Sequence, residues 1–329
     1  MHDNLIERRT KSGSLQETRS KLQSLISEAV IKHKTESISL SGGLDSSILA
    51  SCLGRKARAY AMIARDFPST DLVNAQLVAN MFGLELVVIP ESTDNLLNAI
   101  EQTIKILKVF NPIEIRNNIV VYTTMKHAKD DGFKSMMTGD GADELFAGYN
   151  FFQRMSIPEL KKDLERIWKV MHFPSRSISK ELGIELHTPF LDDDVVAYAK
   201  SLSPELKVRE ENGKKYGKWV LRKAFERSLP QSIVWREKSA MQDGSGTNGL
   251  TSFFDNTIPS HTFAEKAARY LEKEQVSLSS KEALCYYEIY RRYYDYPSML
   301  GQSKNKCPNC SYSFEEKSHF CRMCGSFPI

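Results

Sequence analysis

The stretch SISLSGGLDSSILAS, residues 37–51, constrains the fold of this chain more than any other feature. It starts as a β-branched and apolar run, passes through two glycines, and continues as a second apolar run, which predicts a strand, a tight turn and a helix. Backbone amides at the start of a helix bind anions, and paired glycines let the chain approach a phosphate closely. We therefore predict a phosphate site at the end of a buried strand, where open α/β sheets bind their ligands.

The side chains of this loop add to the predicted site. Ser41, Ser46 and Ser47 offer hydroxyl donors to phosphate oxygens. Asp45 would repel a phosphate, so we expect Mg²⁺ between the two. The loop lacks the Gly-Lys-Ser/Thr of a Walker A motif, and a lysine must come from elsewhere. The alternative is an ordinary turn in which a serine caps the helix.

Strand and helix signals alternate from residue 37 to about residue 150. Strands are expected at SISL, ARAYAMIA, LELVVIP and KSMMTGDG, with helices over 46–53, 72–81, 95–107 and 119–129. This order predicts an α/β fold with a parallel sheet covered by helices on both faces. Beyond Phe151 only amphipathic helices are expected. We predict four parts: an arm and helix over 1–35, a nucleotide-binding α/β region over 36–150, a helical part over 151–300, and a small cysteine-rich part over 301–329.

Composition excludes several classes of protein. The 329 residues are 41% hydrophobic and 26% charged, which is typical of a globular protein with a full core. No apolar run is long enough to cross a bilayer, and the N-terminus lacks a secretory signal, so we expect a cytoplasmic protein without a membrane partner. The net charge of +4 suits anionic ligands such as nucleotides but does not by itself indicate nucleic acid.

A second loop, MMTGDGADELFAGYN over residues 136–150, repeats the strand, glycine turn and helix pattern. It places Asp140, Asp143 and Glu144 within five positions. Three carboxylates at a strand end repel one another unless a cation or protons offset their charge. A solvated acidic cap on a helix is the alternative.

The C-terminal cysteines have the spacing of a metal site. Cys307, Cys310, Cys321 and Cys324 form Cys-x₂-Cys-x₁₀-Cys-x₂-Cys, which is typical of a zinc ribbon with tetrahedral Zn²⁺. Four thiolates close the coordination sphere, so we expect a structural rather than a catalytic ion. A nucleic acid or protein partner for the ribbon is an open alternative, because a modest basic face is expected from Lys304, Lys306, Lys317 and Arg322.

The first loop resembles the PP-loop of ATP pyrophosphatases, and the second resembles the signature of asparagine synthetases. Further segments resemble that family in the same order, from about residue 38 to residue 297: STDLVNAQLVANMFG, GIELHTPFLDDDVV, GKWVLRKAFERSLPQSIVWREKSAMQDGSG and KEALCYYEIYRRYYDYP. The resemblance covers the synthetase domain only. It implies a PP-loop domain, similar to the adenine nucleotide alpha hydrolases, followed by a helical half.

The resemblance also implies site residues. Carried over position by position, Asp45 and Asp143 would hold Mg²⁺, and Lys218 and Lys238 would neutralise phosphate charge. Asp140, where the family has glutamate, would act as a base or positioning group for the attacking amine. Binding of ATP or pyrophosphate is implied for Ser41, Gly42, Gly43, Leu44, Asp45, Ser46, Ser47, Met62, Thr138 and Gly139. For the acceptor substrate, Arg116 is expected to clamp a carboxylate, together with Glu185 and Asp192.

The implied reaction is the ATP-dependent amidation of a carboxylate, through an acyl-adenylate, with release of pyrophosphate and AMP. Aspartate is the leading acceptor, although His187 replaces an arginine of the family. Because residue 2 is His2 and few residues precede the first strand, we expect no glutaminase domain, and use of free ammonia or of a separate glutaminase partner. The alternatives are a tRNA-modifying PP-loop enzyme, amidation of another carboxylate, or a non-catalytic nucleotide-binding protein.

Overall fold

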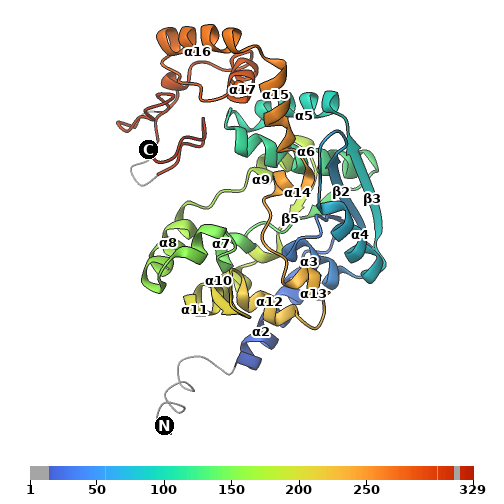
Figure 1. Cartoon of the computed structure of the whole chain (residues 1–329). Coiled ribbons are helices and arrows are strands. Elements are labelled where there is room, and N and C mark those ends of the chain that lie inside the picture. The colour runs from blue at the N-terminus through green and yellow to red at the C-terminus, as the bar shows by residue number, and fades with distance from the viewer. Residues whose placement is uncertain (1–14, 56, 302, 315–318) are drawn as a thin grey trace.

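A computed structural model describes residues 15–55, 57–301, 303–314 and 319–329 of the chain (Figure 1). The predicted N-terminal arm over residues 1–14, which includes His2, lies outside this range. At the centre is a five-stranded parallel sheet with the order β3-β2-β1-β4-β5. Its strands are β1 (Ser37–Ser39), β2 (Arg58–Ala64), β3 (Glu85–Glu91), β4 (Ser135–Met137) and β5 (Glu185–His187).

The predicted alternation of strands and helices is confirmed up to β4. The helices of this half are α2 (Leu15–Lys32), α3 (Leu44–Leu53), α4 (Asp71–Phe82), α5 (Thr93–Leu107) and α6 (Pro112–Asp130). α6 begins seven residues before the expected helix over 119–129, because Asn111 caps it by accepting from two backbone amides and Pro112 follows at its first position. Ser92 caps α5 by accepting from the Asn95 amide.

β2 shows how the sheet divides the core in two. Ala59 and Ala61 belong to one apolar cluster and Tyr60, Met62 and Ala64 to the other, since successive side chains of a strand point to opposite faces. α2, α3 and α4 cover the first face, and α5 and α6 cover the second. The prediction of helices on both faces is therefore confirmed.

The expectation of no strand after Phe151 is wrong. β5 pairs with β4 at the edge of the sheet, with Met136 opposite Leu186. β6 (Arg209–Glu211) and β7 (Lys214–Tyr216) form a separate antiparallel hairpin. Strands of three residues are too short to show a hydrophobic period, and a pairing partner outside the segment decides that they form.

The remaining elements are helical (Figure 1). They are α7 (Ala142–Phe146), η2 (Asn150–Arg154), α8 (Ile157–Val170), α9 (Pro174–Leu182), η3 (Pro189–Leu191), α10 (Asp193–Ser201), α11 (Pro204–Lys207), α12 (Trp219–Phe225), α13 (Gln231–Val234), α14 (Met241–Ser245), α15 (Gly249–Thr257), α16 (Ser260–Glu274), α17 (Lys281–Arg291) and η4 (Pro297–Met299). Within the described residues, no helix has the length and apolar character that a membrane span requires.

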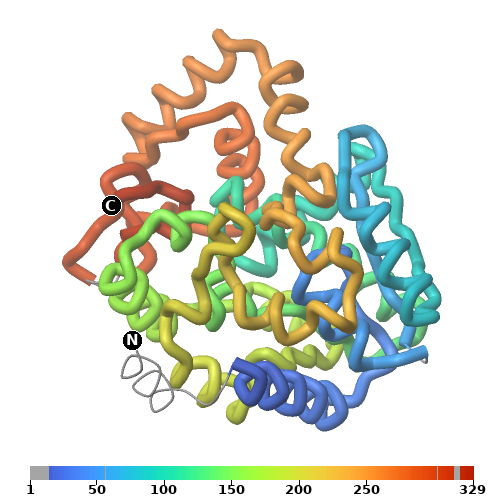
Figure 2. The backbone as a smooth tube through the Cα atoms, turned by 60° about the horizontal axis from the view of Figure 1, so that its bottom comes forward, coloured from blue at the N-terminus to red at the C-terminus, as the bar shows by residue number. Residues whose placement is uncertain are grey.

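The cysteine-rich segment packs onto the body of the protein. Cys307, Cys310, Cys321 and Met323 are buried in the same apolar cluster as α5, α6 and α17. Figure 2 shows this red C-terminal segment beside the green segment of the chain that contains α8. The cysteine-rich segment, called the ribbon below, is thus part of the apolar cluster on the α5 and α6 face of the sheet rather than a separate module.

Candidate active site

A cavity at the carboxyl ends of the strands lies where the strand order reverses. Chain order runs outward from β1 to β3 on one side and from β4 to β5 on the other, so β1 and β4 flank a topological switch point. Loops that leave two such strands in opposite directions open a crevice at their carboxyl ends. The cavity has a volume of about 490 Å³ and is lined by both glycine loops recognised in the sequence.

The first loop passes from β1 into α3, and its residues Ser41 and Ser46 line the cavity. The Gly43 amide donates to Ser41 Oγ at 3.2 Å, and Ser46 Oγ donates to the Gly43 carbonyl at 3.2 Å. Gly42 has a φ of +70° and lies against the α4 backbone at Asn74, where no Cβ would fit. Tight local bonds and a left-handed glycine therefore hold the start of α3 toward the cavity.

Most of the predicted ATP-binding residues line this cavity. Those that do are Ser41, Gly43, Leu44, Asp45, Ser46, Met62, Thr138 and Gly139. Gly42 packs against α4 instead, and Ser47 is fully buried behind the loop. These two residues shape the loop from behind, whereas the others face the cavity.

Two lysines and two aspartates meet at the centre of the cavity. Lys218 Nζ lies 2.6 Å from Asp45 Oδ2 and 2.6 Å from Asp143 Oδ1. Lys238 Nζ lies 2.7 Å from Asp143 Oδ2. The aspartates come from the loops that follow β1 and β4, and the lysines come from the start of α12 and from the segment before α14. The lysines therefore reach the phosphate loop from another part of the chain, as the sequence predicts.

These four charges stabilise one another. Burial alone would raise the pKa of Asp143, but Lys218 and Lys238 outweigh it and hold this pKa below its ordinary value. Burial alone would lower the pKa of Lys238, but Asp143 and Asp45 raise it above the ordinary value. Asp143 and Lys238 are therefore both charged at neutral pH.

Backbone geometry lets Lys218 reach the centre. Lys218 has a φ of 54°, which is the left-handed region, and its amide donates to the Phe146 carbonyl at 2.9 Å. Gly148 packs so closely on Asp143 and Lys218 that any Cβ would collide with both. The end of α7 and the start of α12 thus interlock through residues in unusual conformations, which is common at functional sites.

Two further carboxyl groups, Asp140 and Glu144, line the cavity near α7. Ser175 Oγ donates to Asp140, and burial raises the pKa of Asp140 above its ordinary value. Tyr149 donates to Glu144 at 2.5 Å, and burial also raises the pKa of Glu144. Asp140 and Glu144 thus take up protons more readily than free carboxylates, in contrast to Asp143.

The segment that carries Lys238 is fixed over the cavity from two sides. Arg236 Nη2 donates to Asp71 Oδ1 at 3.2 Å, at the start of α4. The Gln242 amide donates to Asn117 Oδ1 at 3.1 Å, and Arg116 Nε donates to Gln242 Oε1 at 2.8 Å, on α6. This segment is therefore hydrogen-bonded to α4 on one face of the sheet and to α6 on the other.

Three predicted substrate-binding residues are not brought to the cavity. Arg116 is buried in an ion pair with Glu282, and its Nη1 also donates to Thr251 at 2.9 Å. Glu185 is exposed on β5, and Asp192 caps α10 and binds Lys32 Nζ at 2.7 Å. Arg116 is held by a carboxylate of the protein itself, so it does not clamp a substrate in this conformation.

The cavity wall also carries polar residues that were not predicted as site residues. They are Asn117, Asn118, Tyr149, Asn150, His172 and Ser175. The two asparagines follow Arg116 directly, one or two positions farther along α6, and that neighbourhood was their only signal. His172 lies between α8 and α9 and Ser175 in the first turn of α9, in a stretch whose pattern indicates helices alone.

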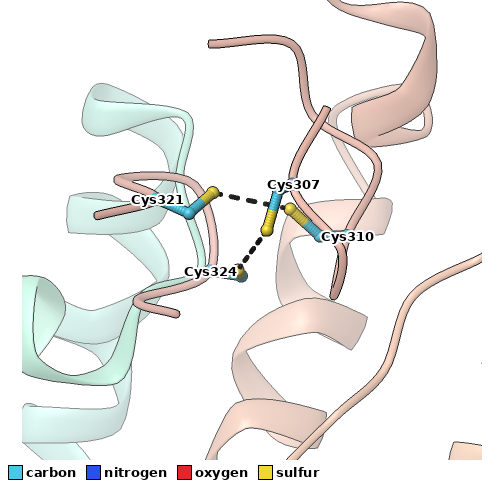
Figure 3. Close-up of side chains that lie close together, drawn as sticks. All are labelled: Cys307, Cys310, Cys321 and Cys324. Carbon is cyan, nitrogen blue, oxygen red and sulfur yellow. Dashed lines mark hydrogen bonds between the residues drawn. The ribbon is translucent and has the colours of Figure 1, made fainter. Parts of the chain in front are cut away.

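The four C-terminal cysteines form a compact thiol cluster (Figure 3). Their sulfur atoms all lie within 4.8 Å of one another, with Cys307–Cys324 and Cys310–Cys321 both at 3.7 Å. A tetrahedron of sulfurs at the Zn–S bond length of about 2.3 Å has edges of about 3.8 Å. The thiols present therefore fit a tetrahedral Zn²⁺ ion.

Comparison with known proteins gives consistent matches. The family described as asparagine synthase matches residues 17–177 and 159–310. Asparagine synthetase B [glutamine-hydrolyzing] of Escherichia coli (strain K12) is 30% identical over 312 residues, covering 86% of this chain and 54% of that protein. The asparagine synthetase [glutamine-hydrolyzing] of Cricetulus griseus is 28% identical, covering 88% of this chain and 55% of that protein. The chain thus spans about half the length of these relatives.

The solved structures that match are more distant in sequence. The NMN synthetase from Francisella tularensis matches with a TM-score of 0.36 and 16% identity, covering 85% of this chain and 94% of that chain. An NH3-dependent NAD synthetase from Campylobacter jejuni matches with a TM-score of 0.31 and 14% identity, covering 76% of this chain and 99% of that chain.

Proposed function

The chain belongs to the asparagine synthase family of ATP-dependent ligases, and from this premise we propose that it forms an amide from a carboxylate and ammonia while converting ATP to AMP and pyrophosphate. One observation carries the proposal. Lys218 and Lys238 meet Asp45 and Asp143 at the switch point between β1 and β4, beside a loop whose amides suit a phosphate. Catalysis then consists mainly of positioning and charge stabilisation.

The triphosphate of ATP would lie along the first loop. Ser41, Ser46 and the amides at the start of α3 would bind the pyrophosphate part. Asp45 Oδ1 is buried and has no hydrogen-bond partner among the described residues, so it has a free coordination site for a cation. Asp45 and Asp143 would hold Mg²⁺, which would supply charge neutralisation for the phosphates.

The proposed chemistry has two steps. A carboxylate oxygen of the acceptor forms a bond to the α-phosphorus, and the bond from that phosphorus to the bridging oxygen breaks, so pyrophosphate leaves. Ammonia then attacks the activated carbonyl carbon, loses a proton, and displaces AMP. Lys238 and Lys218, which meet the aspartates at the cavity, would stabilise negative charge that develops on the phosphates in the first step.

The acceptor would occupy the wall formed by α6 and the α8–α9 connection. Asn117, Asn118 and Ser175 offer amide and hydroxyl groups there. Aspartate is our leading acceptor, and other carboxylates are the competing candidates. A tRNA-modifying activity is not favoured, because the family match runs through both halves of the chain.

Nitrogen would arrive as ammonia, either from free ammonium or from a glutaminase on a separate subunit. The relatives carry the description glutamine-hydrolyzing. Turnover of the purified chain with ammonium and with glutamine as alternative donors distinguishes direct use of ammonia from hydrolysis of glutamine.

One experiment tests the proposed function. The chain is incubated with ATP, Mg²⁺, ammonium and each member of a panel of amino acids and small carboxylic acids. We expect AMP and pyrophosphate in equal amounts, and only with an acceptor that becomes amidated. Formation of ADP, or no acceptor-dependent release of pyrophosphate with any member of the panel, would contradict the proposal.

Asp140→Asn is expected to lower the rate of amide formation about 10²-fold, the usual contribution of a general base. Asp140→Glu, which restores the residue of the family, should retain more activity. Because the pKa of Asp140 is raised by burial, the low-pH limb of the rate profile should lie at higher pH than for an ordinary carboxylate. An unchanged profile in Asp140→Asn would contradict this role.

The same substitution is expected to stabilise the fold at neutral pH. With a folded-state pKa above the unfolded value, Asp140 favours folding at low pH, and that contribution is lost as the pH rises through the folded pKa. Asparagine removes the buried charge, so the free energy of unfolding of the variant should exceed that of the wild type at pH 7 but not at pH 3. Urea titrations at both pH values measure this.

We also propose that the ribbon holds one structural Zn²⁺ per chain. Cys310→Ser is expected to abolish stoichiometric zinc, because a three-thiolate site binds far more weakly and a segment this short depends on the metal for its fold. Cys52→Ser is the matched control and should keep one zinc. Elemental analysis of both purified variants gives the ratio, and equal zinc in the two would refute the site.

A further inference from the structure

The ribbon is bonded to three separate parts of the protein. The Met323 carbonyl accepts from the Phe110 amide at 2.9 Å, next to the cap of α6. The Asn309 carbonyl accepts from the Ser277 amide at 2.6 Å, before α17. The third bond comes from Arg322, whose Nη2 donates to the Val170 carbonyl at 2.6 Å. The ribbon therefore connects α6, α17 and α8.

The bond to Val170 lies at the end of a helix. Val170 is the last residue of α8, and the final carbonyls of a helix lack partners within it. A guanidinium is a strong donor to such a carbonyl and also complements the negative end of the helix dipole. Arg322 thus fixes the point at which α8 turns into the connection that leads to α9.

This connection forms part of the cavity wall. His172, Phe173, Pro174 and Ser175 all line the cavity, and Ser175 donates to Asp140. Burial lowers the pKa of His172, and the guanidinium groups of Arg322 and Arg176 lower it further, which places two cations near this residue. The wall around His172 therefore combines a neutral imidazole with two nearby guanidinium groups, and one of these, Arg322, also lies near the buried carboxyl group of Glu114.

We propose that the ribbon holds residues 171–175 in place at the acceptor end of the cavity, and that Arg322 is a positioning residue for an anionic, carboxylate-bearing acceptor. This inference rests on the ligase function proposed above. It assigns the ribbon a role inside its own chain, in which Arg322 is bonded to the end of α8. Lys317, a second residue of the predicted basic face, lies outside the described residues.

Arg322→Ala tests the proposal, with Lys306→Ala as the matched control. Both residues are exposed and basic and belong to the ribbon, but Lys306 precedes Cys307, whereas Arg322 follows Cys321. Amide hydrogen exchange over residues 170–176 is expected to become about threefold to tenfold faster in Arg322→Ala, as for loss of one charge-assisted hydrogen bond, and to stay unchanged in Lys306→Ala. Removal of zinc by a chelator, followed with a zinc-sensitive dye, should accelerate exchange in the same peptides.

Kinetics separate positioning from a purely structural effect. In Arg322→Ala the KM for the acceptor should rise about threefold to tenfold, while the KM for ATP stays within about twofold. Unchanged exchange over 170–176, or an equal change in both variants, would overturn the proposal. Faster exchange with an unchanged acceptor KM would overturn the positioning role and leave the ligase function intact. Absence of AMP formation in the wild type would overturn the ligase function and with it the acceptor role.

Discussion

Lys238→Ala is expected to lower the rate of AMP formation about 10³-fold without unfolding the protein. Lys238 supplies one of two cations at the centre of the cavity, and loss of one preorganised charge at a reacting phosphate has an effect of this size. Lys218 still lies between Asp45 and Asp143 in the variant, so the buried carboxylates keep a partner. Quenched-flow or coupled assays of AMP and pyrophosphate measure the loss.

Lys223→Ala is the matched control for this experiment. Lys223 lies on α12, five residues after Lys218, but pairs with Glu211 and Glu226 outside the cavity. Its replacement should change the rate less than about twofold, because such peripheral ion pairs contribute little. A rate for Lys238→Ala within tenfold of the wild type would exclude this lysine from the chemistry.

Glu282→Gln is expected to lower the free energy of unfolding by about 3–5 kcal/mol. The substitution leaves the Arg116 guanidinium buried without a counter-charge, since the side chains of Arg116 and Glu282 are only 9% and 2% exposed. Removing one partner of a buried ion pair has a much larger effect than the net contribution of the pair itself. Urea-induced unfolding, followed by fluorescence and circular dichroism, measures the change.

Two further variants define the cause. Glu288→Gln removes a carboxylate from the same helix, but its partner Lys266 is at the surface, so a loss of at most about 1 kcal/mol is expected. The double variant Arg116→Met with Glu282→Met should be more stable than Glu282→Gln, because no unpaired charge remains. Equal destabilisation by Glu282→Gln and Glu288→Gln would show that burial of the pair is unimportant.

The sequence was most informative at the two glycine loops, where one short stretch carries both the backbone pattern and the charged side chains. Each glycine loop predicts a strand, a turn and a helix within a few residues. The α/β order and the two acidic loops could therefore be predicted from short stretches of sequence. The resemblance to asparagine synthetases, which rested on motifs in a fixed order, is confirmed by the family match. That β1 and β4 lie side by side is a property of the sheet order, which no single segment encodes.

Arg116 shows why part of the site could not be predicted. An arginine flanked by polar residues on a helix is compatible with a substrate clamp and with a buried ion pair. Its partner Glu282 lies 166 positions away, and only the packing of α17 against α6 selects the second alternative. β5 and the wall around His172 could not be predicted for a similar reason. A strand of three residues and an irregular connection are both too short to show a hydrophobic period.

The spacing of the central charges along the chain has a consequence for synthesis on the ribosome. Asp45 and Asp143 are made first, and translation must add nearly a hundred further residues before Lys238 emerges to face them. A nascent chain that has folded its sheet therefore exposes an uncompensated acidic corner to the solvent. Until the lysines arrive, that corner needs water or a divalent cation from the cell, so we expect metal availability to affect the biogenesis of the protein as well as its proposed turnover.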